Sequence, residues 1–214
     1  MNKNDSYSSL VNIIKIKNKF KICFSIDSKK YFYYTYSNSQ NHLQNLLATL
    51  TVISIFFDLK YISKNIFLDF KFPDGRGDYS KLKIKNKIIN LVDESYNSNP
   101  LSLKNALINF GDIKLKKNYK HALLGDMLEL GTSSINHHIS VAKIINKLDI
   151  DKVHIYGKNI KKTYENLNKT KKGIVFSNLS KIRELINISL NNNDYLMIKG
   201  SNSTGLFKQT QLLK

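Results

Sequence analysis

A dense run of hydrogen-bonding side chains, DESYNSNP, follows an apolar pair at residues 91–92. The apolar residues predict a strand that ends near Val92. Pro100 predicts the first turn of a helix, where its missing N–H is not needed. Ser98 or Asn99 would cap that helix, and capping alone accounts for Asn99 and Pro100. It leaves unexplained two carboxylates, a phenol and a further amide, which belong to Asp93, Glu94, Tyr96 and Asn97.

Adjacent carboxylates at the end of a strand can accept hydrogen bonds from ribose hydroxyls, and a side-chain amide can recognise a polar ligand. We therefore interpret residues 93–97 as part of a ligand site as well as a capped loop.

Two further polar stretches follow predicted strands. In GDMLELG, Asp126 comes directly after a strand and Gly131 after a predicted short helical turn, so both a turn with a C-cap glycine and a ligand site stay open. In KGSNSTG, Lys199 precedes small polar residues and the start of the last helix. Backbone N–H groups at a helix start attract anions, so this stretch can hold a phosphate or a carboxylate.

Triphosphate binding of the P-loop kind has no candidate motif in these 214 residues. That motif reads G-x-x-x-x-G-K-[ST], and GKN at 157–159 lacks both the first glycine and the hydroxyl.

The five histidines do not predict a metal site. His137 and His138 are adjacent on a predicted helix and so point to different faces. No carboxylate or thiol cluster surrounds these two at ligand spacing. His42, His121 and His154 are interpreted as isolated structural residues on a helix, a strand edge and a strand.

Hydrophobic periodicity separates the chain into two parts. Residues 10–36 alternate in short bursts, which predicts an antiparallel meander. A helix is predicted next, capped by an Asn/Ser cluster, with one apolar stripe formed by Leu43, Leu46, Leu47, Leu50, Ile53 and Phe57. NIFLDF, at 65–70, predicts a short strand or helix, and FPDGRGD, at 72–78, is the predicted domain boundary.

After residue 78 a hairpin leads into short apolar strands that alternate with amphipathic helices. This pattern predicts an α/β fold with a mostly parallel, doubly wound sheet. Ligands bind at the carboxyl ends of the strands in such sheets, and the unusual polar stretches all follow strands. We therefore expect them to meet at one edge.

Charge and cysteine content constrain the class of protein. The formal charge is +18, from 34 Lys+Arg against 16 Asp+Glu. A charge of this size requires a nucleic-acid or membrane-surface partner to be considered. The lysines are scattered and do not form one stripe, so solvated faces are favoured over a nucleic-acid footprint. Cys23 stands alone and is interpreted as a small buried hydrophobe. No apolar run is long enough to span a bilayer and no signal peptide is apparent, which predicts a cytoplasmic protein.

Taken in order, LVDESYNSNP, LLGDMLELG, a His seven residues after that glycine, and MIKGSNSTGL resemble the C-terminal domain of the Mur ligases. Within that family they resemble the branch that joins D-alanyl-D-alanine to UDP-N-acetylmuramoyl-tripeptide. The resemblance implies a Rossmann-like dipeptide-binding domain at 76–214. It also implies that residues 1–75 are the strand-and-helix tail of a truncated ATP-binding domain.

The family uses ATP and Mg²⁺ to form an acyl phosphate that the dipeptide amine attacks. By resemblance, Asn45 contacts adenine, Arg76 reaches the γ-phosphate and Glu94 binds ribose. Residues facing the dipeptide or the transferred phosphate are implied to be Asp93, Tyr96, Asn97, Asn99, Asp126, His138, Lys199, Ser201 and Asn202. Arg76 and Lys199 are the implied catalytic residues.

This chain departs from the family pattern in two ways. Ser39 and Asn41 stand where the family has Gly and His before the adenine-contacting Asn. The UDP-binding domain, the P-loop and the magnesium ligands have no counterpart here. Three hypotheses therefore remain: part of an active ligase that needs a separate N-terminal half, a non-catalytic binding module, or an unrelated nucleic-acid-binding protein.

Overall fold

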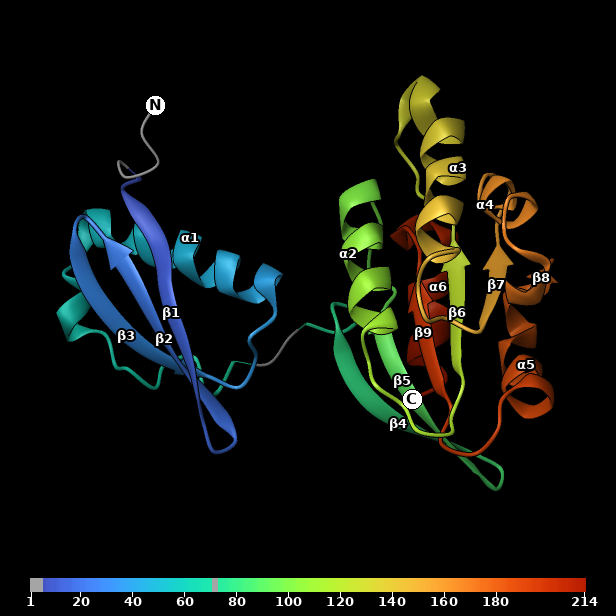
Figure 1. The fold of residues 1–214 in the computed structure, drawn as a ribbon, viewed down its shortest axis with the longest axis horizontal. Helices are drawn as coiled ribbons and strands as arrows, with labels where there is room; N and C mark the ends of the chain where they lie inside the picture. Colours follow the sequence, from blue (N-terminus) through green and yellow to red (C-terminus); the bar gives the residue numbers. More distant parts are fainter. Residues whose placement is uncertain (1–5, 71–72) are drawn as a thin grey trace. The chain divides into compact units, whose positions relative to one another are not determined.

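A computed structural model describes residues 6–70 and 73–214 of the chain (Figure 1). The chain divides into two compact units, Met1–Lys71 and Phe72–Lys214, and each is described by itself.

Unit 1 is the predicted antiparallel meander followed by the predicted helix. Strands β1 (Ser8–Ile16), β2 (Lys19–Ile26) and β3 (Lys29–Thr35) pair in that order. Helix α1 (Gln40–Phe56) follows, and then the 3₁₀ helix η1 (Leu59–Tyr61). Alternation places one set of strand side chains against α1, and the buried core of the unit consists of Ile22, Phe24, Ile26, Tyr33, Leu43, Leu46, Leu50 and Leu59.

Several details of unit 1 differ from the sequence-based expectation. Phe57 was predicted on the buried stripe, but it is the C-cap of α1 and 71% of it is exposed. Residues 65–70 form turns and neither a strand nor a helix. Ser39 is the N-cap of α1 but its side chain makes no capping hydrogen bond. Cys23 is buried, as predicted.

Unit 2 is built on a six-stranded sheet. Its strands are β4 (Asp78–Ile84), β5 (Lys87–Glu94), β6 (Lys120–Gly125), β7 (Lys152–Tyr156), β8 (Lys172–Phe176) and β9 (Tyr195–Lys199). They lie in the order β4-β5-β9-β6-β7-β8. The β4–β5 hairpin is antiparallel and every other pair is parallel. The predicted α/β class with a mostly parallel sheet is confirmed.

Helices cover both faces of this sheet because its central strands are apolar on both sides. The helices of unit 2 are α2 (Pro100–Gly111), α3 (Ser134–Ile145), α4 (Lys161–Glu165), α5 (Ile182–Ser189) and α6 (Leu206–Gln211). The short 3₁₀ helices are η2 (Gly131–Ser133), η3 (Lys169–Lys171), η4 (Leu179–Lys181) and η5 (Asn202–Thr204). Apolar side chains of α2 and α3 join one core and those of α5 and α6 join the other.

Strands β5 to β9 are parallel, so their carboxyl ends meet at one edge of the sheet, which we call the carboxyl edge. The loops after β5, β6, β7 and β9 carry the polar stretches singled out above. The loop after β6 differs in detail, because residues 126–130 form no helical turn and Gly131 opens η2 and caps nothing. The last helix begins at Leu206, close to the start near Thr204 that the sequence predicts.

Candidate ligand-binding site at the carboxyl edge

Arg76 is held at the carboxyl edge by a glycine-flanked loop. Gly75 and Gly77 have φ values of +74° and +88°, a region that favours glycine. The backbone N–H of Tyr96 donates to Gly75 O at 3.0 Å, and the N–H of Gly77 donates to Asp93 O at 2.8 Å. A Cβ on Gly75 would lie 2.8 Å from Tyr96 N, so this close approach requires glycine. The loop is thereby fastened to the end of β5.

The Arg76 guanidinium lies over an aromatic ring. Its Cζ is 4.3 Å from the ring centroid of Tyr96, and Phe207 contacts the same ring edge-on at 5.4 Å between centroids. The exposed guanidinium is planar and always charged, so it can bind a phosphate or carboxylate through two parallel hydrogen bonds. Stacking holds the group near the end of β5 without occupying its N–H donors.

Glu94 and Lys199 form a partly buried ion pair at the ends of β5 and β9. Lys199 Nζ lies 3.4 Å from Glu94 Oε2 and donates to Asn97 O at 2.9 Å. The Lys199 side chain is 2% exposed and that of Glu94 27%. Burial raises the pKa of Glu94 and lowers the pKa of Lys199, while the attraction of each for the other opposes both changes. A carboxylate with one side open to solvent remains available to hydroxyl donors.

Asp93, by contrast, has partners within the protein for both carboxylate oxygens. It is completely buried, and its Oδ1 accepts hydrogen bonds from the backbone N–H and the hydroxyl of Ser95. Its Oδ2 accepts from Gln211 Nε2 at 3.0 Å and pairs with Lys214 Nζ at 2.8 Å. Asp93 therefore connects the end of β5 to the C-terminal residues.

Asp126 and His138 hold the loops that follow β6 and β7. Asp126 accepts from the backbone N–H groups of Lys158 and Ile160, at 3.0 and 2.7 Å. The buried His138 ring accepts from Met127 N–H through Nε2 at 3.1 Å, and its Nδ1 lies 2.7 Å from Ser134 O. Both ring nitrogens therefore have partners within the chain, with the proton on Nδ1.

Ser201 connects three of the loops, because its hydroxyl accepts from Leu128 N–H at 2.9 Å and donates to Ser98 O at 3.1 Å. Asn99, one of the two caps that the sequence predicts, caps α2, and it forms a reciprocal capping box with Ser102. Asn97 and Asn202 are exposed at the same edge. Asn45 is exposed on α1 in unit 1.

The structure therefore brings the predicted residues of unit 2 together and separates them by role. The groups that face outward are Arg76, Glu94, Tyr96, Asn97 and Asn202, and Lys199 lies just beneath them. Those whose side chains support the loops are Asp93, Asn99, Asp126, His138 and Ser201. Sequence reasoning missed Phe207, Gln211 and Lys214, since nothing in their local pattern indicates contacts with residues more than one hundred positions earlier.

This edge offers a fixed cation, a second cation beneath it and a carboxylate, which suits a ligand with both an anionic group and hydroxyls. Within residues 6–70 and 73–214, no group of three or more His, Cys, Asp or Glu side chains could hold a metal ion. No helix in the described part of the chain is long and apolar enough to cross a membrane.

Residues 82–202 match the family model described as "Mur ligase, glutamate ligase domain". The chain belongs to the Mur ligase family. That match includes β5, β6 and β9, whose carboxyl ends carry Glu94, Asp126 and Lys199.

Relatives within the family are UDP-N-acetylmuramoyl-tripeptide–D-alanyl-D-alanine ligases. The Buchnera aphidicola protein is 29% identical over 224 residues, which cover 90% of this chain and 47% of that protein. The Rickettsia prowazekii protein is 27% identical over 227 residues, covering 96% of this chain and 50% of that protein. This Mur ligase chain thus spans about half the length of the curated relatives it matches.

Solved structures show the same fold. The MurF ligase of Thermotoga maritima, solved in complex with ADP, aligns over 99% of this chain and 47% of its own, with a TM-score of 0.73 and 18% identity. A MurF of Acinetobacter baumannii aligns over 97% of this chain and 44% of its own, with a TM-score of 0.72 and 19% identity.

Proposed function

We propose that this chain is the C-terminal part of an ATP-dependent amide-bond ligase that joins D-alanyl-D-alanine to UDP-N-acetylmuramoyl-tripeptide in peptidoglycan synthesis. The observation that carries the proposal is the carboxyl edge itself. Arg76 is stacked on Tyr96 beside the Glu94–Lys199 pair, in a chain that aligns over most of its length with ligases of that name.

In this proposal residues 1–75 are the tail of the ATP-binding domain and residues 76–214 are the dipeptide-binding domain. When bound, ATP supplies the phosphoryl group that activates the tripeptide carboxylate. The Arg76 guanidinium holds the γ-phosphate, and Glu94 accepts hydrogen bonds from the ribose hydroxyls. Asn45 contacts adenine from α1.

The remaining outward-facing groups then serve the dipeptide. Lys199 gives the edge a positive charge, which favours the carboxylate of D-alanyl-D-alanine, and Asn97 and Asn202 offer amide donors and acceptors. The loop-supporting residues keep these groups in place, which is how positional catalysis is obtained.

Magnesium has no fitting site among the described residues, since they contain no cluster of potential ligands. We propose that the metal ligands and the P-loop of the ligase lie in a region outside these 214 residues, and that turnover in the cytoplasm requires both regions. A non-catalytic module that binds nucleotide or peptide is the second candidate. It is favoured by the internal hydrogen bonds of Asp126 and His138, whose side chains already have partners within the chain. We propose no specific nucleic-acid partner and no membrane insertion.

The test is reconstitution. The chain is purified and mixed with a polypeptide containing the UDP-binding domain and the P-loop half of a related D-alanyl-D-alanine-adding ligase. ATP, Mg²⁺, UDP-N-acetylmuramoyl-tripeptide and D-alanyl-D-alanine are then supplied, and product is followed by mass spectrometry. The ligase proposal expects product only when both polypeptides are present. Nucleotide or dipeptide binding by this chain without any product in the mixture would favour the non-catalytic module.

A further inference from the structure

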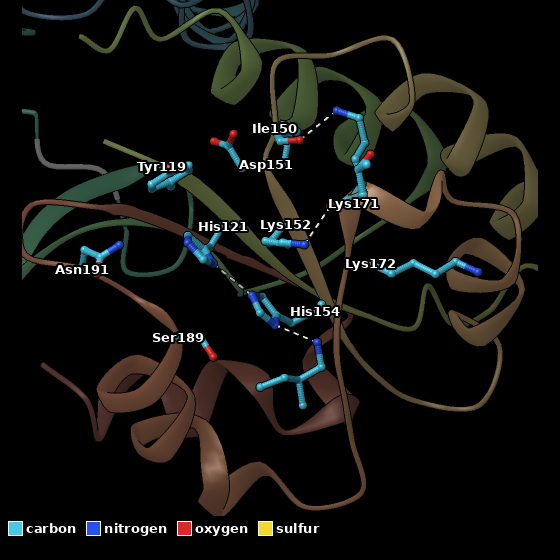
Figure 2. Close-up of a pocket in the computed structure, with 13 residues that line it drawn as sticks. Tyr119, His121, Ile150, Asp151, Lys152, His154, Lys171, Lys172, Ser189 and Asn191 are labelled. Carbon is cyan, nitrogen blue, oxygen red and sulfur yellow. Dashed lines mark hydrogen bonds between the residues drawn. The ribbon is translucent and has the colours of Figure 1, made fainter. Parts of the chain in front are cut away.

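Unit 2 also contains a hollow that none of the carboxyl-edge residues lines. It is a cavity of about 600 Å³ at the opposite edge of the sheet, where β6, β7 and β8 begin (Figure 2). Its walls carry two imidazoles, three lysines, one carboxylate (Asp151) and several neutral polar groups. The lining residues include His121, His154, Lys152, Lys171, Lys172 and Tyr119. A volume of this size accommodates a ligand as large as a small metabolite.

A local distortion of the sheet forms one wall. The pairing of β7 with β8 shifts register between Val153 and Ile155, so the His154 ring reaches the neighbouring backbone. Its Nδ1 accepts a hydrogen bond from Ile174 N–H at 3.0 Å. A Cβ on Gly173 would lie 2.6 Å from that nitrogen, so the arrangement needs glycine there. Bulges of this kind often occur beside ligand sites, because they re-aim a side chain.

The two histidines form an ordered chain of hydrogen bonds. Their rings stack with 8° between planes, and His121 Nδ1 lies 3.1 Å from His154 Nε2. Because His154 Nδ1 is an acceptor, its Nε2 carries the proton and donates to His121 Nδ1. His121 Nε2 therefore also carries a proton, and it lies 3.7 Å from Asp194 Oδ2. Both imidazoles are thus fixed as neutral tautomers.

The lysines around the cavity bring more positive charge than the nearby carboxylates balance. Lys152 Nζ donates to Thr170 O at 2.8 Å, and Lys171 Nζ donates to the carbonyls of Leu148 and Ile150. Lys172 Nζ donates to Glu165 O and lies over the ring of Tyr164. In the described part of the chain, none of these three ammonium groups forms an ion pair with a carboxylate.

Two carboxylates lie near these lysines. Asp149 pairs with the ammonium of Lys120 at 2.8 Å, and Asp151, which lines the cavity, accepts from the backbone N–H of Lys120 at 2.8 Å. Both act on Lys171 only at longer range. The cavity therefore has a net positive wall, made by ammonium groups that are held in place by carbonyl oxygens and not neutralised by them.

We propose that this cavity binds a small molecule carrying an oxyanion of the phosphate or carboxylate class. The ammonium groups of Lys152 and Lys171, which bond to carbonyls of the cavity lining, attract the oxyanion. Tyr119, Ser189 and Asn191 on the cavity wall offer neutral hydrogen-bonding groups to the body of the ligand. The site is separate from the carboxyl edge and does not depend on the ligase activity proposed above.

The test follows the imidazole resonances of His121 and His154 by NMR while the full chain is titrated with pyrophosphate, and separately with citrate. Chloride replaces each anion in a parallel titration to keep the ionic strength constant. A double variant, Lys152→Gln with Lys171→Gln, is compared with a control, Lys81→Gln with Lys83→Gln, which removes two exposed lysines of β4 in the same unit.

Support for the site would be saturable chemical-shift changes of both histidines with at least one of the anions. The affinity obtained from them should be at least tenfold weaker in the double variant and unchanged in the control. Saturation by pyrophosphate alone assigns the phosphate class, and saturation by citrate alone assigns the carboxylate class. Shifts in the wild-type chain that rise without saturation for both anions, or that weaken equally in both variants, would overturn the proposal. If the double variant does not fold, the wild-type titration still shows whether the cavity binds either anion saturably.

Discussion

Replacing His138 with Phe tests whether this residue supports the loop after β6 or contacts a ligand. The ring is completely buried, accepts from Met127 N–H through Nε2 and donates from Nδ1 to Ser134 O. Phe keeps a planar ring of similar size and removes both nitrogens. The variant therefore changes hydrogen bonding while it preserves most of the packing.

The cost follows from the burial of the two partners. Met127 is completely buried, so its N–H is left without an acceptor, which costs about 1–3 kcal/mol. Ser134 is only half-buried and water can reach its carbonyl, so the second lost bond adds about 1 kcal/mol or less. We expect the variant to lose about 2–3 kcal/mol of unfolding free energy in unit 2.

The adjacent histidine provides a matched control. His137 lies on the same helix and is half-buried, and its ring makes no hydrogen bond among the described residues. His137→Phe should change stability by less than about 0.5 kcal/mol.

Hydrogen exchange in increasing urea, read by mass spectrometry on peptides that contain β6, gives the unfolding free energy of unit 2 separately from unit 1. Equal stability of His138→Phe and the wild type would refute this reasoning and return His138 to the ligand-contacting residues.

Three other perturbations have definite expected outcomes. Burial lowers the pKa of His154 to about 3, so below pH 6.5 the unfolded chain binds a proton at this residue that the folded chain does not. His154 alone should lower the unfolding free energy by about 1.4 kcal/mol between pH 7.5 and 5.5, and the pKa of His121, which burial also lowers, acts in the same direction; urea unfolding that gives equal values at the two pH values would contradict this. Gly173→Ala places a methyl group against the His154 ring and should cost about 1–3 kcal/mol in a thermal unfolding assay, whereas an unchanged midpoint would show that the bulge relaxes freely. In Gly75→Ala the new Cβ would lie 2.8 Å from Tyr96 N, at a φ of +74°, and the variant should lose about 1–3 kcal/mol of unfolding free energy. Wild-type protection of the Tyr96 amide in hydrogen exchange would count against this loop geometry.

Local sequence patterns predicted correctly the features of the fold that interactions between neighbouring residues determine. The capped start of α2 follows from Asn99 and Pro100, because a cap and a helix-starting proline act within one turn. The parallel sheet follows from short apolar strands such as residues 120–125, which are buried on both faces. The gathering of polar stretches at one edge follows from that topology.

Contacts between distant segments could not be predicted in this way. The hydrogen bond between Gln211 and Asp93 joins residues 118 positions apart and depends on how α6 packs against the sheet. His121 and His154 were interpreted as isolated, and this was wrong, because the register of β6 and β7 stacks their rings. The helical turn expected before Gly131 is absent, since Glu129 adopts a φ of 61°.

The central claim is that the carboxyl edge handles phosphate through Arg76, and one measurement tests it most directly. In the reconstituted ligase mixture, kcat/KM for ATP is compared between Arg76→Ala and Arg183→Ala, which alters the only other arginine of the chain. Arg183 is exposed on α5, and its guanidinium donates to Leu212 O at 2.8 Å. We predict a loss of about 2–4 kcal/mol of transition-state stabilisation for Arg76→Ala and near wild-type turnover for Arg183→Ala. Equal turnover by the two variants would contradict the account.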